Sequence, residues 1–260
     1  MQDRLRLVSA GIFGLVLFAV CAAPCSAQGS EAKEKPPMYS YVANWAIPRA
    51  QWGEMAKAGD ADKAVLDKAL ADGTIVGYGS DETVVHQADG VTHDDWWSAM
   101  SMAGLLKVLD QISGGGASSA PVLVSATNHF DEIMVSRYYN WKPGAWKNGY
   151  GHVALYSLKK DAPDNAIDVM SKQVVVPLFE KFVADGTVRE YEVDQEAIHT
   201  QAPNRFWIVY VASSPEGIDT VQSALVKLVD SQPLLGPALG SMTNDSDHRD
   251  ELARSEGVYK

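Results

Sequence analysis

A sixteen-residue segment occurs twice in this chain without a gap. Residues 71–86 read ADGTIVGYGSDETVVH and residues 184–199 read ADGTVREYEVDQEAIH, so seven of the sixteen positions are identical at an offset of 113. A shorter match relates residues 129–136 to residues 248–255 at an offset of 119. An internal repeat constrains the fold strongly, because each copy has to form the same supersecondary unit. We therefore expect two copies of one unit of roughly 110 residues.

Hydrophobic spacing predicts the same six elements in both copies, in the order strand, helix, strand, strand, helix, strand. The first helix of each copy has an apolar face with the same spacing, made of Val65, Leu66, Ala69 and Leu70 in one copy and Leu178, Phe179, Phe182 and Val183 in the other. The Asp-Gly that follows is typical of a helix end that turns into a strand, since glycine adopts the left-handed backbone conformation without steric cost. The repeated motif is therefore interpreted first as a structural corner.

The order of elements is that of the ferredoxin-like split βαβ unit. Two such units in one chain can pair sheet against sheet, and this arrangement resembles the dimeric α/β-barrel superfamily, with a covalent tandem in place of a homodimer. The lysine- and glycine-bearing helix followed by Ala-Asp-Gly-Thr and a strand is similar to the antibiotic-biosynthesis-monooxygenase, EthD and NIPSNAP groups. The resemblance implies an α+β fold in which unit 1 (residues 38–150, with an aromatic linker) and unit 2 (residues 151–260) pair as an intramolecular α/β barrel, a pseudo-dimer.

Residues 1–27 have the layout of a secretory signal peptide. Two arginines precede an apolar run, and small residues lead to Cys25-Ser26-Ala27, so cleavage is expected before Gln28. An uncleaved membrane anchor and a lipid anchor on Cys21 are the alternatives. Cleavage removes both cysteines and leaves no disulfide and no stable membrane anchor. We expect a periplasmic or secreted protein that begins with a disordered leader at residues 28–37.

The chain is acidic, with a formal net charge of −11. Phosphate contacts need a basic surface, so nucleic acid is not an expected partner. The sequence has no phosphate loop, dinucleotide fingerprint, Gly-x-Ser-x-Gly nucleophile motif or His-Glu-x-x-His zinc motif. We predict no cofactor and no metal. Some members of the superfamily bind haem, and the histidines described next include candidate ligands.

Four histidines form two repeat-equivalent pairs, His86 with His199 and His129 with His248. In each His-x-Asp sequence the two side chains share one face of a strand, so Asp131 is expected beside His129 and Asp250 beside His248. An imidazole oriented by a carboxylate can act as a general base, which makes these four residues the candidate catalytic residues. We further expect His86 to approach the second pair and His199 the first. The alternative is that the histidines make structural hydrogen bonds at strand ends.

Candidate ligand-binding residues are His86, His199, Tyr78, Tyr191 and Trp141. The two tyrosines are repeat-equivalent and are either core residues or groups that orient a ligand in a cavity. Trp141 belongs to an aromatic segment, residues 138–150, that either covers a sheet edge or forms a pocket wall. The preferred function is binding of a small apolar or aromatic ligand between the two units. The alternatives are a cofactor-independent monooxygenase or isomerase, with His129 or His248 as base, and a structural or interaction module.

Overall fold

The computed structural model describes residues 32–86, 90–116, 120–200 and 204–260. The predicted signal peptide and the first residues of the predicted leader lie outside these ranges. In the rest of the leader, Lys35 N donates a hydrogen bond to Arg137 O (2.8 Å), and the Tyr139 hydroxyl donates to Pro36 O (2.9 Å). This part of the leader is therefore held against a strand rather than disordered. Within the described ranges, no helix has both the length and the apolar character that a membrane span needs.

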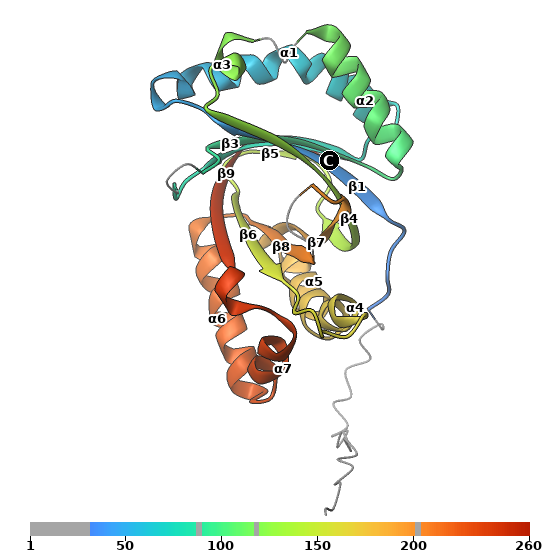
Figure 1. Ribbon diagram of the computed structural model, residues 1–260, viewed down its shortest axis with the longest axis vertical. Helices are drawn as coiled ribbons and strands as arrows, with labels where there is room; N and C mark the ends of the chain where they lie inside the picture. Colours follow the sequence, from blue (N-terminus) through green and yellow to red (C-terminus); the bar gives the residue numbers. More distant parts are fainter. Residues whose placement is uncertain (1–31, 87–89, 117–119, 201–203) are drawn as a thin grey trace, which may run out of the picture. The chain divides into compact units, whose positions relative to one another are not determined.

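Eight antiparallel strands form a closed barrel (Figure 1). The strands are β1 (Met38–Ala46), β2 (Gly77–Thr83), β3 (His93–Ala99), β4 (Asn128–Trp141), β6 (Tyr150–Ser157), β7 (Val188–Ile198), β8 (Arg205–Ala212) and β9 (Arg249–Tyr259). Their order is β2-β3-β1-β4-β7-β8-β6-β9, and β9 pairs with β2 to close the barrel. A short strand, β5 (Ala145–Trp146), also pairs with β9. The predicted α+β class and the predicted barrel are confirmed.

The strand order is the same in the two halves of the chain. The first half contributes β2-β3-β1-β4, and the second contributes β7-β8-β6-β9. The halves meet at two seams, β4 with β7 and β2 with β9, and both seams are antiparallel. Main-chain hydrogen bonds therefore continue around the barrel from one half into the other.

Helices cover the outside of the barrel. They are α1 (Trp52–Ala71), α2 (Met102–Gly115) and α3 (Pro121–Val124) in the first half, and α4 (Ala166–Met170), α5 (Val176–Asp185), α6 (Pro215–Ser231) and α7 (Leu235–Met242) in the second. A π-helical turn, Ser171–Val175, joins α4 to α5, and 3-10 turns lie at Arg49–Gln51 and Asp245–Asp247. In Figure 1, α1–α3 lie on one side of the barrel and α4–α7 on the other. Helices α3, α4 and α7 are too short for helical periodicity to mark them in the sequence.

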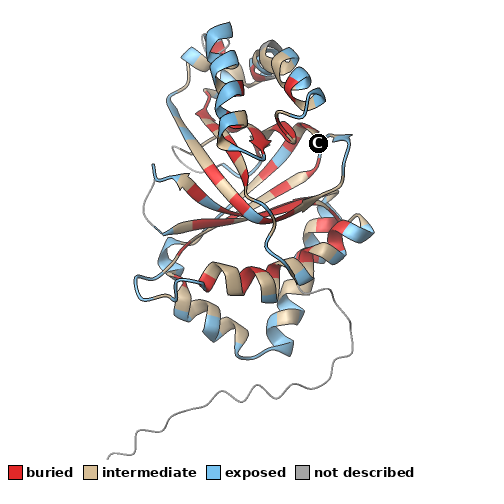
Figure 2. Ribbon diagram, turned by 90° about the vertical axis from the view of Figure 1, so that its right-hand side faces the viewer, coloured by how far each residue is buried: buried red, intermediate tan, exposed pale blue. Residues whose placement is uncertain are grey.

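The outward faces of the strands pack against the helices in two hydrophobic cores. In the first half, Leu105 and Val108 of α2 are 0% and 1% exposed. In the second half, Phe179 and Phe182 of α5 pack against outward residues of β7. Figure 2 shows the buried residues in red along the strands and on the neighbouring helices. Because successive side chains of a strand point to opposite faces, the alternate positions are left to line the barrel interior.

Each Ala-Asp-Gly-Thr run forms the predicted corner between a helix and a strand. Gly73 and Gly186 end their helices with φ angles of 76° and 87°, in the left-handed region that favours glycine. In the first copy Thr74 N donates to Asp72 Oδ1 at 3.0 Å, and the second copy repeats this bond at 2.9 Å. The structural interpretation of the repeated motif is confirmed.

Candidate ligand-binding cavity

The barrel encloses a cavity of about 400 Å³. All eight barrel strands contribute side chains to its wall, because the inward positions of a strand recur at every second residue. The larger apolar side chains in the wall are Val42, Val85, Val91, Trp96, Phe130, Met134, Val153, Leu155, Trp207, Val209 and Val211. A cavity therefore lies between the two halves, where the sequence predicts one.

The cavity is acidic as well as apolar. Eight acidic residues line it, namely Asp81, Asp94, Glu132, Glu190, Glu192, Asp194, Asp250 and Glu251, and of these the Asp250 carboxylate is paired with two histidines on the outer face. Among the described residues, the cationic side chains of the wall are Arg205 and Arg249. A buried carboxylate is costly unless it is paired or hydrogen-bonded, so most of these acids need a proton, a cation or a donor.

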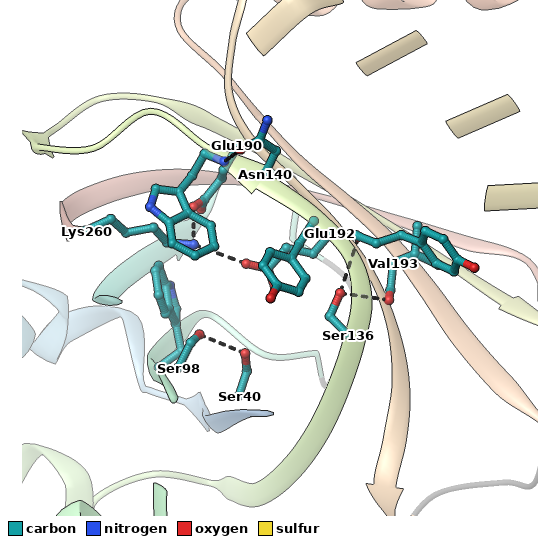
Figure 3. Close-up of polar contacts among 12 residues, drawn as sticks. Ser40, Ser98, Ser136, Asn140, Glu190, Glu192, Val193 and Lys260 are labelled. Atoms are coloured by element: carbon teal, nitrogen blue, oxygen red, sulfur yellow. Dashed lines mark hydrogen bonds and ion pairs between the residues drawn. The ribbon is translucent and has the colours of Figure 1, made fainter. Parts of the chain in front are cut away.

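Lys260 lies beside two of these acids (Figure 3). Its side chain is 1% exposed, and its Nζ forms ion pairs with Glu190 and with Glu192, the latter at 3.1 Å. The same Nζ lies 5.0 Å and 4.9 Å from the ring centroids of Trp96 and Trp141. Burial by itself lowers the pKa of Lys260. The two glutamates raise this pKa by more than burial lowers it, so it lies above its usual value. The barrel interior thus holds one ammonium group between carboxylates and indole rings.

Asp81 and Asp94 form a carboxyl pair across β2 and β3, where they are direct register partners. Trp96 Nε1 donates to Asp81 Oδ2 at 2.9 Å. Burial, followed by the charge of Asp81, raises the pKa of Asp94 well above its usual value. Burial also raises the pKa of Asp81, and hydrogen bonding opposes that increase. Of the two, Asp94 is therefore the carboxyl that burial and its neighbour make harder to ionise.

Glu132 and Asp194 also ionise with difficulty. Burial, followed by the charge of Glu196, raises the pKa of Glu132 to about 7. Burial, followed by the charge of Glu192, raises the pKa of Asp194 well above its usual value. Asp194 is 6% exposed, and its Oδ1 has no hydrogen-bond partner among the described residues. These carboxyls are suited either to exchange protons or to bind a cationic group that enters the barrel.

The first His-x-Asp pair forms, but on the outer surface of the barrel. His129 Nε2 lies 3.4 Å from Asp131 Oδ1, and the Nδ1–H of His129 donates to Asn44 O at 2.9 Å. The imidazole stacks on Trp45 at a centroid distance of 3.6 Å. The side chains of His129 and Asp131 are 36% and 43% exposed, and the cavity on this strand is lined by Glu132 instead.

The second copy repeats this pair and adds another imidazole. His248 Nε2 lies 3.3 Å from Asp250 Oδ2, and the ring stacks on Tyr156 at a centroid distance of 4.4 Å. His152 Nε2 lies 3.5 Å from the other carboxylate oxygen of Asp250. This copy therefore has a group of two imidazoles and one carboxylate, but its second imidazole is His152 and not the predicted His86.

His86 and His199 do not join these groups. The ring of His86 packs on Trp52 at a centroid distance of 4.8 Å, and His199 is exposed just after β7 ends. In the part of the chain that the structure describes, neither contacts the His-x-Asp residues of the other copy. The predicted convergence is not observed, because the chain after β2 turns the His86 ring toward Trp52 of α1.

Tyr78 and Tyr191 face the helices rather than the cavity. The Tyr78 hydroxyl donates to Asp67 of α1, and the Tyr191 hydroxyl donates to Glu180 of α5 at 2.7 Å. Asp67 and Glu180 are repeat-equivalent, so both copies anchor a helix to its strand by the same bond. Trp141 packs over Lys260 and is outside the cavity wall.

The sequence does contain a signal for an acidic strand face, although not for the direction in which that face points. In β7, residues 190–196 read EYEVDQE, with an acidic residue at every second position. Such alternation indicates one acidic face of a strand, and in an open antiparallel sheet that face meets water. Asp81 and Asp194 occupy the same position of the two repeats. After the Ala-Asp-Gly-Thr corner, this is the one position at which both repeats have aspartate. Closure of the barrel turns both side chains inward.

No protein-family model matches this sequence, and no curated protein does. Solved structures match through their fold. A proposed monooxygenase from Lactobacillus acidophilus superposes with a TM-score of 0.61 at 12% identity, over 87% of this chain and 97% of its own. A proposed monooxygenase from Fusobacterium nucleatum gives a TM-score of 0.62 at 8% identity, over 87% and 95%. An anthrone oxidase-like protein gives 0.52 at 11% identity, over 86% and 93%.

Proposed function

We propose that this chain, which has the fold of the dimeric α/β-barrel superfamily, binds a small organic molecule inside its barrel. The observation that carries the proposal is the space of about 400 Å³ that the inward side chains leave open. Pockets for small ligands are about 300–1,000 Å³ and have mainly apolar walls with a few placed polar groups. A purely structural barrel of this strand number would fill its interior with side chains.

The ligand should have an apolar or aromatic body. Phe130, Trp207 and Val209 offer flat or branched apolar surfaces to it. Aromatic rings in such a wall favour stacked or edge-to-face contact with another ring. The carboxyl groups then supply the polar contacts that fix the orientation of the ligand.

An oxygenase or isomerase reaction is the second candidate. Solved structures that share the fold include two proposed monooxygenases. Glu132, which lines the cavity, is a candidate general base for such a reaction. Burial raises its pKa to about 7, and a base with this pKa is suited to remove a proton from a substrate at neutral pH. In this reading Glu132, and not His129 or His248 on the outer surface, is the base. A Glu132→Gln variant should then lose turnover and keep substrate binding.

We also propose that the barrel consists of two fused ferredoxin-like units. The support is the matching strand order of the halves and the two repeat-equivalent tyrosine bonds. Cleavage at a protease site inserted at Gly144, in the connection between the halves, should leave them associated through the β4–β7 and β2–β9 seams. Separation of the cleaved halves under native conditions would contradict this assignment.

Binding of N-phenyl-1-naphthylamine, a neutral aromatic dye that fluoresces in apolar surroundings, tests the proposed function. A Val209→Trp variant fills the cavity, whereas Val226→Trp on α6 adds the same ring at a side chain that is 60% exposed. We expect the dye to bind the wild type and Val226→Trp, and to lose about tenfold or more in affinity for Val209→Trp. Circular dichroism checks that both variants fold. Equal dye binding by all three proteins would refute a site inside the barrel.

A further inference from the structure

The charge of the barrel interior restricts what can enter it. Eight acidic residues line the cavity, and the two arginines of its described wall are Arg205 and Arg249. Lys260 already forms ion pairs with Glu190 and Glu192, so its charge is compensated within the protein. Some of the carboxyls carry protons. An anionic ligand would still be repelled by the ionised carboxylates and would meet the hydrogen-bond acceptors of the wall. A cation would find compensation for its own loss of hydration.

Two carboxylate oxygens at equivalent places in the repeat have no partner. Asp81 Oδ1 and Asp194 Oδ1 are buried, and neither has a hydrogen-bond partner among the described residues. Asp194 is 6% exposed and lines the cavity, so its carboxyl group lies in the wall of the space in which a ligand would lie. The adjacent Ser136 hydroxyl donates to Val193 O at 3.0 Å, and hydrogen bonding from Ser136 also opposes the rise that burial causes in the pKa of Asp194, so the unpartnered oxygen of this carboxyl is Oδ1 alone. A buried acceptor without a donor is rare in folded proteins and points to a missing partner.

An aromatic ring stands beside this acceptor. Trp207 on β8 is the direct register partner of Asp194 on β7, and both side chains line the cavity. A carboxylate next to an indole face is a good environment for an ammonium group, since the ring attracts a cation through its quadrupole. Lys260 occupies such an environment, with Glu190, Glu192 and the face of Trp96 around its Nζ. The contacts of Lys260 Nζ with carboxylates and an indole ring are therefore of the same kind as those that Asp194 and Trp207 could make with the ammonium group of a ligand.

We propose that the cavity selects an organic cation, a protonated amine on an apolar or aromatic body, with its ammonium group at Asp194 beside Trp207. Asp194 Oδ1 accepts a hydrogen bond from the ammonium, and the apolar body lies along Phe130, Val153 and Val209. The size of the cavity suits a compact amine with one or two rings. This inference rests on the proposed function, because it specifies the class of ligand for the same cavity.

Three probes of similar shape and different charge test the inference on the full chain. They are 2-phenylethylamine, 2-phenylethanol and phenylacetate, and their affinities are measured by calorimetry and by the fluorescence of the cavity tryptophans at pH 7. We expect the amine to bind about tenfold or more tightly than the alcohol, because a hydrogen bond to a charged group is stronger than a neutral one. Phenylacetate should bind most weakly.

The Asp194→Asn variant removes the acidic group that can ionise beside an ammonium and keeps the shape of the side chain. It should lower the affinity for the amine by about tenfold and leave the affinity for the alcohol nearly unchanged. The matched control is Asp230→Asn on the exposed face of α6, which should change neither affinity. If the wild type binds 2-phenylethylamine and 2-phenylethanol with equal affinity, the inference is overturned, and no variant is needed to decide this. The same ratio in wild type and Asp194→Asn overturns the placement of the ammonium group.

The outcomes separate this inference from the proposed function. If the neutral dye and 2-phenylethanol bind and the amine has no advantage, the cavity binds ligands but does not select cations. If none of the four probes binds, the proposed function fails together with the inference. An amine that binds equally well to Val209→Trp lies outside the barrel, which also contradicts the inference.

Discussion

Replacement of Lys260 by methionine tests whether the buried ion pairs hold the interior of the barrel together. Methionine keeps most of the length and packing of the side chain and removes its charge. Lys260 Nζ contacts Glu190 and lies 3.1 Å from Glu192 Oε1, and the lysine side chain is 1% exposed. The variant therefore leaves two buried glutamates without their cation.

The expected loss of stability follows from these distances. At the 3.1 Å that separates Lys260 Nζ from Glu192 Oε1, the attraction is about 5 kcal/mol for an effective dielectric constant of about 20. Proton uptake by the glutamates limits the cost, and loss of one partner from a buried ion pair typically costs about 3–5 kcal/mol. We expect the free energy of unfolding of Lys260→Met to be lower than that of the wild type by about 3–5 kcal/mol at pH 8.

The loss should shrink as the pH falls. Burial raises the pKa of Glu190 to about 7 even with Lys260 in place, and the variant raises it further. When folding raises the pKa of a carboxyl, the free energy of unfolding falls as the pH rises from the pKa of the unfolded state to the pKa of the folded state. At pH 5 Glu190 of the folded variant is protonated, which removes one uncompensated charge, so we expect a loss of about 1 kcal/mol or less.

Urea unfolding at pH 8 and pH 5, followed by tryptophan fluorescence, measures both values. Lys227→Met, at an exposed position of α6, is the matched control and should change stability by less than about 0.5 kcal/mol. Adding Glu190→Gln to Lys260→Met should restore part of the stability at pH 8, because it removes one uncompensated charge. A loss below about 1 kcal/mol for Lys260→Met at pH 8, or a loss that does not depend on pH, would refute the reasoning.

Three further predictions concern single side chains. Glu132→Gln should raise the free energy of unfolding by about 2 kcal/mol at pH 8 and leave it unchanged at pH 4, because burial raises the pKa of Glu132 to about 7 and its ionisation then opposes folding. Urea unfolding at the two pH values measures this, and a gain at pH 4 as large as that at pH 8 would contradict it. Gly73→Ala should cost about 1 kcal/mol through its φ of 76° alone, since a methyl group there meets no atom within 4 Å. Thermal unfolding detects that loss, and Gly59→Ala inside α1 is the control, which should not destabilise. Tyr191→Phe should cost about 2 kcal/mol because its buried hydroxyl donates to the Glu180 carboxylate. Tyr78→Phe should cost less, since Asp67 is more exposed and keeps its ion pair with Lys63; equal losses for the two tyrosines would contradict this comparison.

The repeat and its hydrophobic spacing determine most of the architecture. Corners with positive φ form where Asp-Gly follows a helical stripe, because glycine is needed there whatever the rest of the chain does. The order of strands and helices in each half also follows from local periodicity. The His-x-Asp pairs form for the same reason, since residues two apart on a strand must share a face.

Closure of the barrel decides which strand face becomes the interior, and no local pattern contains that information. The alternating acids of β7 would lie on the solvent face of an open sheet, but here the helices cover the opposite face and the acids line the cavity. The same closure puts His129 and His248 outside. It also brings His152 rather than His86 to Asp250, because strand pairing across the sheet, and not distance along the chain, sets which side chains meet. The sequence alone determines the elements and their order, whereas the tertiary structure alone determines the inward and outward faces and therefore the site.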